Sequence, residues 1–397
     1  MAAPETYARI DLGALGRNLQ AIRRHVTTTP NTPTTSIRPT TPRDRAERLV
    51  LLPVKANAYG HGLSLVARAV QEHRWADWLG VASVDEGLAL RQAGVTLPIL
   101  KLSGAPADQV ETAIDYDLRL TIVDQAGAAV AQQAAQRLGT IAPVHLKIDT
   151  GMRRIGVEPA TATDLASFIE AQPNLELEGV FTHLATADDP AEDDFTTLQL
   201  TRFTTTVEAI EDRLARRLPL VHAANSGAVL AHPNAWFDLV RPGILSYGYY
   251  PSPVVAQTVT VEPVLSWVSH LSFVKPVAAG ETVSYGRTWT APRDTIIGTV
   301  PVGYGDGYSR TWSNRVEVIV AGARRRQVGR ICMDQLMVDL GPDSTLKPGQ
   351  PVTLIGREGL AAIGADDLAA ISGTISYEVL TGLGARVPRV MFPSQSQ

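Results

Sequence analysis

The feature that most constrains the fold is a regular alternation of short apolar runs with longer segments of helical periodicity. The alternation extends from Arg9 to about Gly248, and its apolar runs cover residues 49–56, 78–82, 97–102, 118–123, 143–149, 175–183, 218–224 and 237–243. Between the runs, apolar residues recur at helical spacing. Eight alternations in about 240 residues are typical of a (β/α)8 barrel, because an open doubly wound sheet usually has fewer strands and a glycine-rich first turn. We therefore predict an α/β fold with a TIM-like (β/α)8 barrel over residues 10–248.

The rest of the chain has the pattern of a second domain. From residue 249 onward, short runs rich in Val and Thr are separated by Gly, Pro or Asp, which is typical of strands joined by turns. We predict a mainly β domain over residues 249–397, joined by residues 1–9, with helices near 366–373 and 374–384. In the stretch 27–42, twelve of sixteen residues are Thr or Pro. We expect an exposed loop there, inserted between the first helix and the first strand.

Composition limits the classes of function. A formal net charge of −4, with no basic stripe beyond Arg324–Arg326, argues against nucleic acid or an anionic membrane as a partner. Cys332 is the single cysteine, which excludes an intramolecular disulfide and a Cys-rich zinc cluster and indicates a reducing compartment. The N-terminal residues lack an apolar signal segment, and no later run approaches the length of a spanning helix. We therefore expect a cytoplasmic protein without a metal site.

Polar residues follow the ends of several predicted strands. In a (β/α)8 barrel these strand ends share one rim, where the active site lies. The polar or small residues at this rim are Lys55 after the first strand, Asp149, Arg153 and Arg154 after the fifth, His183 after the sixth, His222, Asn225 and Ser226 after the seventh, and Arg241 and Gly243 after the eighth. Each alone could be a surface charge or a buried structural residue. Their occurrence together favours a functional site.

Lys55 and the last two loops of the predicted barrel suggest a cofactor. A lysine that emerges from an apolar strand is partly desolvated, so its pKa falls and a neutral amine becomes available for Schiff-base formation. The loops after strands seven and eight are a frequent phosphate site in such barrels, and here they supply the Ser226 hydroxyl and the backbone N–H groups of Gly243 and Ile244. These parts suggest pyridoxal 5′-phosphate (PLP), but barrel aldolases share both of them.

Arg241 favours one class of PLP chemistry. If its guanidinium faces the pyridine nitrogen, a permanently charged group that only donates hydrogen bonds keeps that nitrogen unprotonated. The cofactor is then a weaker electron sink than one paired with a carboxylate. This arrangement favours a simple proton transfer at Cα.

A series of motifs resembles the alanine racemase family over nearly the whole chain. The motifs follow the order of the family and read VKANAYGHG (54–62), HLKIDTGMRRIG (145–156), FTHLATAD (181–188), HAANSGA (222–228), RPGILSYG (241–248), VSYGRTWTA (283–291), PVGYGDGY (301–308), GRICMDQLMVD (329–339) and SYEVLTGLG (376–384). The resemblance implies a PLP-dependent isomerase that interconverts L- and D-alanine and supplies D-alanine for peptidoglycan.

The same resemblance implies a role for each motif residue. Lys55 would hold PLP and act as the base on the D-face of the substrate, while Tyr285, from the second subunit of a homodimer, would act on the L-face. Arg154 and the backbone amide of Met333 would orient the substrate carboxylate, and Tyr304 would line the entry passage. His183 and His222 would link the catalytic tyrosine to Arg241. The implied cofactor-binding residues are Lys55, Tyr59, Arg154, His183, Asn225, Ser226, Arg241, Gly243, Ile244 and Tyr377. Of these, Arg154 would contact the phenolic oxygen of PLP and Arg241 its ring nitrogen. The residues implied at the phosphate are Tyr59, Ser226, Gly243, Ile244 and Tyr377.

Three positions leave alternatives open. Lys147 matches a family position often found as a carbamate, and it could equally be an ordinary lysine inside the barrel. Arg153 stands beside Arg154 where the family often has glycine, so the motif alone assigns the inward position to Arg154. The Thr/Pro-rich stretch 27–42 lengthens a loop that is short in the family, and because it precedes the first strand we expect little effect on chemistry.

Rival functions share parts of this pattern. A PLP-dependent decarboxylase of basic amino acids has the same fold and places a cysteine on its β domain, as Cys332 is placed here. The RPGI and VSYG motifs favour the racemase. A broad-specificity racemase resembles secreted, disulfide-bearing proteins, which one cysteine disfavours. A non-catalytic PLP carrier lacks a β domain.

Overall fold

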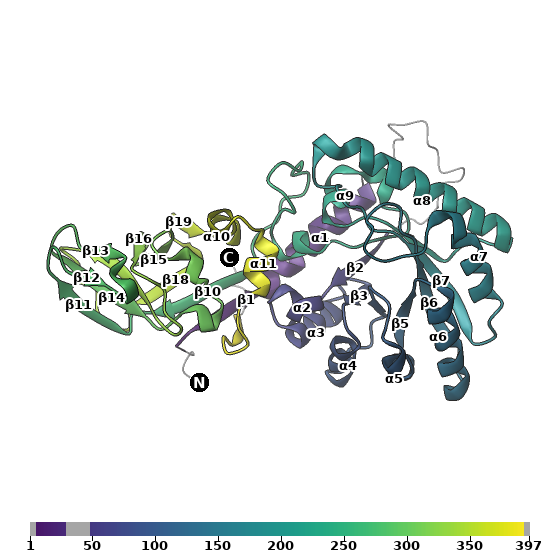
Figure 1. Ribbon diagram of the computed structural model, residues 1–397, viewed down its shortest axis with the longest axis horizontal. Helices are drawn as coiled ribbons and strands as arrows, with labels where there is room; N and C mark the ends of the chain where they lie inside the picture. The colour runs from purple at the N-terminus through teal and green to yellow at the C-terminus, as the bar shows by residue number, and fades with distance from the viewer. Residues whose placement is uncertain (1–4, 29–47, 393–397) are drawn as a thin grey trace. The chain divides into compact units, whose positions relative to one another are not determined.

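The computed structural model describes residues 5–28 and 48–392. The chain forms two compact units, drawn in Figure 1. The barrel unit contains Gly16–Ala58 and Leu63–Val261, and the β unit contains the chain up to Leu15, the short segment Tyr59–Gly62 and the chain from Glu262 onward. Of the predicted Thr/Pro-rich loop at 27–42, only Thr27 and Thr28 are described, at the end of helix α1 (Leu12–Thr28); the rest lies outside the described residues.

The barrel unit is built on a sheet of eight parallel strands in the order β9-β2-β3-β4-β5-β6-β7-β8. Hydrogen bonds from Asp238 N to Val221 O (3.0 Å) and from Arg241 N to Ala224 O (2.9 Å) join the two ends of this order. The predicted (β/α)8 class is therefore confirmed. The strands are β2 (Leu49–Pro53), β3 (Trp78–Val81), β4 (Ile99–Lys101), β5 (Leu118–Ile122), β6 (Ala142–Lys147), β7 (Leu175–Phe181), β8 (Leu220–His222) and β9 (Leu239–Val240).

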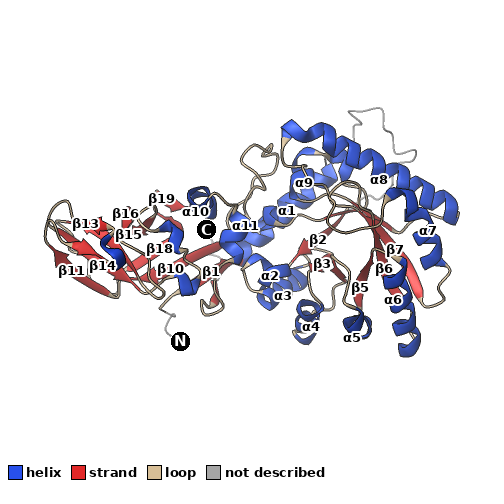
Figure 2. Cartoon of the chain, viewed as in Figure 1, coloured by secondary structure: helices blue, strands red, loops and turns tan. Residues whose placement is uncertain are grey.

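Helices surround these strands (Figure 2). Sequence signals set several of their ends. Ser83 and Glu86 form a capping box at the start of α4, and α6 begins after the Asp124 cap and ends at Gly139 in the left-handed conformation. The helices of the barrel unit after α1 are α2 (Lys55–Tyr59), α3 (Leu63–His73), α4 (Val84–Gln92), α5 (Val110–Asp115), α6 (Gln125–Leu138), α7 (Pro159–Glu170), α8 (Asp193–Leu214) and α9 (Ser226–Ala231), of which α2 ends in the β unit.

The β unit consists mainly of a ten-stranded sheet, as predicted for the C-terminal domain. Its order is β11-β14-β17-β16-β15-β18-β10-β1-β20, and β19 pairs with β18. The N-terminal strand pairs antiparallel to β10 and parallel to β20. Its elements are β1 (Tyr7–Asp11), β10 (Leu265–His270), β11 (Phe273–Val277), β14 (Thr295–Val300), β15 (Glu317–Val320), β16 (Ala323–Val328), β17 (Leu336–Gly341), β18 (Pro351–Glu358), β19 (Ala361–Ile363) and β20 (Arg389–Phe392), the two-stranded sheet β12 (Thr282–Val283) and β13 (Trp289–Thr290), and helices α10 (Ala365–Ser372) and α11 (Ser376–Thr381).

None of the helices in the described parts of the chain combines the length and the apolar character that a membrane crossing requires.

Candidate active site

Lys55 lies just after the carboxyl end of β2 and is followed by a turn whose backbone is left-handed. Ala56, Asn57 and Ala58 have φ values of 53°, 56° and 54°, a left-handed conformation that costs L-residues roughly 1–2 kcal/mol each. Hydrogen bonds hold the turn: Ala56 N donates to Glu86 Oε1 (2.6 Å), Ala58 N to Val54 O (2.7 Å), and Leu63 N to Asn57 Oδ1 (2.7 Å). The surrounding structure therefore fixes the direction in which the chain carries Lys55.

The environment of Lys55 favours its neutral amine. Burial lowers the pKa of Lys55 most, and the positive charge of Arg154 lowers it further. The Glu86 carboxylate opposes these effects, and the more distant Arg241 adds to them. An amine with a lowered pKa is a better nucleophile and base near neutrality.

Lys147, at the end of β6, is buried among other cations. Burial lowers its pKa to about 7, and Arg154, Arg241 and Lys55 act in the same direction, against Asp149. Its Nζ lies 5.3 Å from the centre of the Phe181 ring. The neutral amine of Lys147 is therefore accessible near neutral pH.

Arg153 and Arg154 point to different surroundings. Arg153 forms an ion pair with Glu158, and its side chain is 61% exposed. Arg154 is also exposed, but its charge contributes to the lowered pKa values of Lys55, Lys147 and His183. This contrast supports the assignment of the inward role to Arg154.

Arg241 is buried without a carboxylate partner among the described residues. Its NH1 donates to His222 Nδ1 (2.9 Å), and its NH2 donates to Thr182 O (2.8 Å) and Ala223 O (3.0 Å). Burial lowers its pKa to about 9, so the guanidinium is still charged at neutral pH. Three of the five N–H donors of an arginine are thus engaged, and two are left for a ligand.

Two histidines lie close to these cations. Burial and the charge of Arg241 lower the pKa of His222 and of His183 well below the ordinary value. Both rings are therefore neutral at physiological pH. His222 also contacts His145 of β6, whose ring reaches Glu178 of β7. Neither His145 nor Glu178 was identified from the sequence as a site residue.

The loops after β8 and β9 bring together several hydrogen-bonding groups. Asn225 caps helix α9 by accepting from Ala228 N (3.0 Å), and Ser226 Oγ accepts from Leu245 N (3.3 Å). The buried backbone N–H groups of Gly243 and Ile244 have no acceptor among the described residues. Buried N–H groups are almost always paired, so these two are suited to an external acceptor such as a phosphate oxygen. Asn225 itself acts as a helix cap, and its Nδ2 donates to Leu184 O (3.1 Å).

The other two residues expected at the phosphate lie together in the β unit. The rings of Tyr59 and Tyr377 are 6.0 Å apart, and burial raises the pKa of Tyr59, so its phenol is protonated and able to donate. The chain approaches α11 closely at Gly60: a Cβ atom added to this residue would lie only 2.1 Å from Leu380 O. Arg389 Nε donates to Gly60 O (2.8 Å) and so also ties this segment to the β unit.

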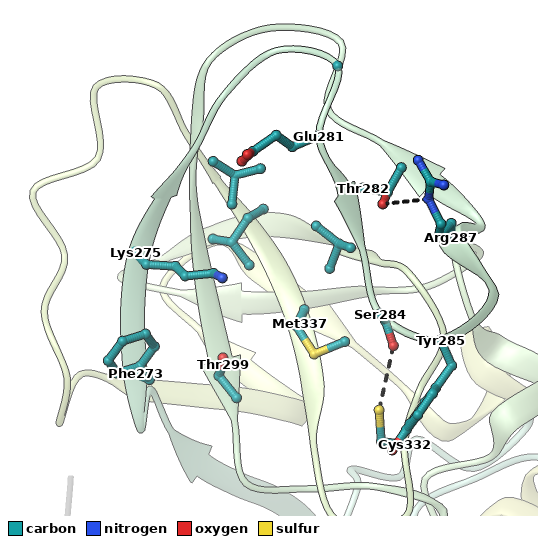
Figure 3. Close-up of a pocket in the computed structure, with 14 residues that line it drawn as sticks. Phe273, Lys275, Glu281, Thr282, Ser284, Tyr285, Arg287, Thr299, Cys332 and Met337 are labelled. Carbon is teal, nitrogen blue, oxygen red and sulfur yellow. Dashed lines mark hydrogen bonds between the residues drawn. The ribbon is translucent and has the colours of Figure 1, made fainter.

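Tyr285 lies on an open face of the β unit. Its side chain is 71% exposed and lines a cavity of about 910 Å³ together with Phe273, Lys275 and Cys332, as Figure 3 shows. The preceding Ser284 has a φ of 68°, and its Oγ donates to Arg330 O (2.7 Å). The hydrogen bond of Ser284 thus holds the turn from which the Tyr285 side chain extends into solvent.

Tyr304 and Met333 lie on two loops that are joined through their backbones. Tyr304 N donates to Cys332 O (3.0 Å) and Gly305 N to Met333 O (2.9 Å). Arg386 also donates to Met333 O (3.3 Å) and bridges the two loops through Asp306 (2.6 Å) and Asp334 (2.7 Å). The Met333 N–H has no acceptor among the described residues. It can therefore bind a ligand carboxylate. The sequence did not point to Arg386.

No group of three or more His, Cys, Asp or Glu side chains in the described parts of the chain is placed to hold a metal ion. The groups that concentrate at the candidate site are instead cationic or donor groups, which indicates an anionic ligand.

Comparison with known proteins identifies the group to which this arrangement belongs. Residues 40–251 match the family model of the alanine racemase N-terminal domain, and residues 264–391 match that of the alanine racemase C-terminal domain. The chain is 45% identical over 384 residues to alanine racemase of Cutibacterium acnes, with 97% of each chain covered. It is 42% identical over 387 residues to alanine racemase of Symbiobacterium thermophilum, covering 97% of this chain and 96% of that one.

Solved structures agree with these matches. The alanine racemase of Clostridium difficile 630 superposes with a TM-score of 0.88 at 34% identity, covering 99% of this chain and 97% of that one. The alanine racemase of Bacillus anthracis with bound L-Ala-P superposes with a TM-score of 0.87 at 33% identity, covering 100% and 97%. These matches support the racemase prediction and not the decarboxylase alternative.

Proposed function

This chain belongs to the alanine racemase family, and from that premise we propose that it interconverts L- and D-alanine with PLP bound in its barrel unit. The observation that carries the proposal is the set of basic side chains Lys55, Lys147 and Arg241, none of which forms an ion pair with a described carboxylate. Uncompensated buried charge is costly. An anionic cofactor and the carboxylate of an amino acid would supply the missing negative charge.

The residues of the barrel unit fit PLP. The two remaining donors of Arg241 suit a pyridine nitrogen that accepts a hydrogen bond. Ser226 and the unpaired N–H groups of Gly243 and Ile244 suit its phosphate, and Arg154 suits its phenolic oxygen. Lys55 would hold the cofactor. When bound, PLP supplies the electron-withdrawing group that makes the α-hydrogen of the amino acid acidic.

Two bases would move the proton. Racemisation removes a proton from one face of Cα and returns one to the other, and a single fixed base cannot reach both faces. Lys55 Nζ, with its lowered pKa, is suited to the D-face, and the exposed hydroxyl of Tyr285 is proposed for the L-face. The free N–H of Met333 would hold the substrate carboxylate, and Tyr304 on the adjoining loop would border the entry.

We also propose a homodimer in which Tyr285 serves the barrel of the partner chain. Tyr285 is 71% exposed, and Phe273 and Met333 on the same unit are 57% and 54% exposed. Tyr285 and Phe273 also line the same cavity, and exposed large apolar side chains that lie together are typical of an interaction surface. In this arrangement, each active site would contain residues from both chains of the dimer.

Lys147 is proposed as a carbamate. The nitrogen of its neutral amine would bond to the carbon of CO2 while the π electrons of one C=O bond move to oxygen, and the amine would release one proton to solvent. A neutral side chain would thereby become an anion. The pKa of about 7 makes that amine available near neutrality, and the neighbouring Arg154 and Arg241 would stabilise the product.

The proposal is tested with Lys55→Ala and Tyr285→Phe in alanine solutions made in D2O. Lys55→Ala should lose the visible absorbance of bound cofactor and all racemisation. Tyr285→Phe should lose racemisation but still exchange the α-hydrogen of D-alanine, because Lys55 serves that face. Borohydride reduction followed by peptide mapping should label Lys55 in the parent enzyme.

Lys347→Ala and Tyr116→Phe, which change residues outside the candidate site, are the matched controls and should behave as the parent. Racemisation at the parental rate by Tyr285→Phe would refute the two-base assignment. Absence of racemisation by the PLP-loaded parent enzyme would refute the function itself.

A further inference from the structure

A continuous line of hydrogen bonds runs from Arg241 into the interior of the barrel. Arg241 NH1 lies 2.9 Å from His222 Nδ1, and His222 Nε2 lies 2.9 Å from His145 Nδ1. His145 Nε2 lies 3.1 Å from Glu178 Oε2. Glu178 is in turn 3.6 Å from Arg119 Nε on β5. The residue after β9 and the strands β8, β6, β7 and β5 therefore contribute in succession to one polar connection.

The direction of every bond in this line is fixed by its first member. An arginine can only donate hydrogen bonds, so His222 Nδ1 must carry a lone pair and its Nε2 must carry the hydrogen. That hydrogen points to His145 Nδ1, which must also be an acceptor. His145 Nε2–H then donates to the Glu178 carboxylate. Both imidazoles are consequently neutral and share one tautomer.

The charged groups around the two rings agree with this assignment. For His145, burial lowers the pKa, the contact with Glu178 opposes that shift, and Arg119 and Arg241 reinforce it. For His222, burial, Arg241, His145 and Lys147 all lower the pKa. A protonated His222 would have to place a hydrogen against the Arg241 guanidinium, which the geometry does not allow.

Local sequence features build the far end of the line. Along β6 and β7 the pairing shifts from Val144↔Leu177 to His145↔Gly179, so Glu178 is an extra, bulged residue. Bulges redirect side chains, and Glu178 reaches His145 while Glu176, on the same strand, is exposed. Gly179 makes room for the imidazole, because a Cβ there would lie 2.6 Å from the His145 ring.

Aromatic rings hold the two imidazoles in place. Phe181 stacks on His222 with ring centres 4.8 Å apart and an angle of 3°. Trp78 meets His145 edge to face at 5.5 Å. Each ring is therefore fixed by packing and by hydrogen bonds at both nitrogens. An apolar core would fill this space at a lower desolvation cost, so a polar line of this length is better explained by its effect on Arg241.

We propose that Glu178 and His145 are positioning residues that act through His222 to hold the Arg241 guanidinium charged and in a single orientation at the rim of the barrel. The Glu178 carboxylate polarises the two histidines in the same sense, which strengthens the bond that Arg241 donates. The functional consequence rests on the proposed function, in which Arg241 faces the ring nitrogen of PLP. The hydrogen-bond line itself does not depend on that function.

The first experiment measures the ring nitrogens of His145 and His222 by 15N NMR in the cofactor-free enzyme. Both rings should carry hydrogen on Nε2 alone, and neither should become protonated between about pH 6 and 8. Glu178→Leu removes the terminal acceptor and should shift the nitrogen signals of both histidines. Glu178→Gln keeps a carbonyl acceptor but removes the charge, so the tautomers should persist. Glu176→Gln, on the same strand, should change neither ring.

A hydrogen on Nδ1 of His222 in the parent enzyme would overturn the proposal, and so would unchanged signals in Glu178→Leu. The parent measurement and Glu178→Gln keep the test decisive if Glu178→Leu does not fold. None of these readings involves PLP or alanine, so they separate a failure of this inference from a failure of the proposed racemisation.

The second experiment titrates PLP into the cofactor-free variants and follows the visible absorbance. Glu178→Leu should weaken PLP binding roughly tenfold, comparable to the loss when outer hydrogen-bond partners of metal ligands are removed. Glu178→Gln should have a smaller effect, and Glu176→Gln none. Parental affinity in Glu178→Leu, despite shifted histidine signals, would show that the line does not position Arg241.

Discussion

At the scale of single residues, the candidate site contains basic side chains that form no ion pair with a carboxylate among the described residues. Arg241 lowers the pKa values of both Lys55 and Lys147, and Lys55 also lowers that of Lys147. The result differs with the type of residue: the pKa values of both lysines are lowered, that of Lys147 to about 7, whereas Arg241, with a pKa of about 9, stays charged. One environment thus provides neutral amines beside a permanent cation. A site that must combine a base with a fixed hydrogen-bond donor needs both.

Lys147 provides a prediction about pH. Its lowered pKa of about 7 means that the neutral amine, which reacts with CO2, is roughly a thousandfold more abundant at pH 7 than for a lysine of pKa 10.4. The amount of carbamate should therefore increase as the pH rises through about 7. With 13C-labelled bicarbonate, 13C NMR should show a protein-bound carbamate that is half-maximal near pH 7. Lys147→Met should abolish it.

Lys101 offers a matched control for that measurement. It is also buried, and its pKa is also lowered, but its Nζ donates to Ser103 O (2.9 Å), Ser103 Oγ (3.2 Å) and Gly104 O (2.7 Å). Three acceptors favour its charged form, so Lys101→Met should retain the carbamate signal. Survival of the signal in Lys147→Met would assign the carbamate to another lysine.

At the scale of elements, two departures from regular geometry aim the functional side chains. The left-handed turn after β2 directs Lys55, and the bulge in β7 turns Glu178 toward His145. Both cost regular hydrogen bonding or backbone energy, and both are supported by named contacts. Strained backbone of this kind persists only where the surroundings determine it.

The turn gives a testable stability change. Glycine adopts a φ near 53°, as at Ala56, without the steric cost that alanine bears. Ala56→Gly should therefore stabilise the protein by about 1 kcal/mol and raise the thermal midpoint by about 2–4 °C for a domain of this size. Ala129→Gly in the middle of α6 is the control and should cost about 1 kcal/mol. If both variants are destabilised equally, the turn does not store strain.

The same elements mark the limit of prediction from sequence. The eight barrel strands were predictable because a buried parallel strand needs an apolar run, and the helix that connects it to the next strand needs a longer segment of helical periodicity. Their ends were less predictable: the first run was expected to reach residue 56, whereas β2 ends at Pro53. Val54 is still apolar and buried, so the hydrophobic pattern does not show where the strand pairing stops.

Other features had little or no sequence signal of their own. Alanine does not favour the left-handed region, so Asn57 was the only residue in KANAY that is typical of this conformation. Strict alternation in LELEGVF would give Glu176 and Glu178 the same outward face, and only the bulge separates them. Arg386 is remote in sequence from Met333 and is brought to it by the fold. Such contacts depend on tertiary structure rather than on local pattern.

At the scale of the whole molecule, the candidate residues are divided between the two units. Lys55, Lys147, Arg154, Ser226 and Arg241 belong to the barrel unit, whereas Tyr59, Tyr285, Tyr304, Met333 and Tyr377 belong to the β unit. Within the β unit, Tyr285 is presented outward on an exposed face. Under the proposed function, a reaction that needs both Lys55 and Tyr285 therefore depends on assembly as well as on folding.

Mixing two inactive variants tests that dependence. In a dimer whose sites each combine Lys55 of one chain with Tyr285 of the other, Lys55→Ala and Tyr285→Phe subunits together form one intact site and one doubly defective site. If subunits exchange at random, half of the dimers are mixed, so about a quarter of the parental racemase activity should return. Reversible unfolding and refolding of the mixture allows the exchange, and refolded single variants are the control.

The amount of recovered activity distinguishes the possible assemblies. If Tyr285 acted on the lysine of its own chain, every site in a mixed dimer would lack one of the two bases, and mixing would restore nothing. If the protein worked as a monomer, dilution would leave specific activity unchanged. Recovery near a quarter, lost on dilution below the dissociation constant of the dimer, is expected only when Tyr285 reaches the barrel of its partner, because only then does one chain repair the defect of the other.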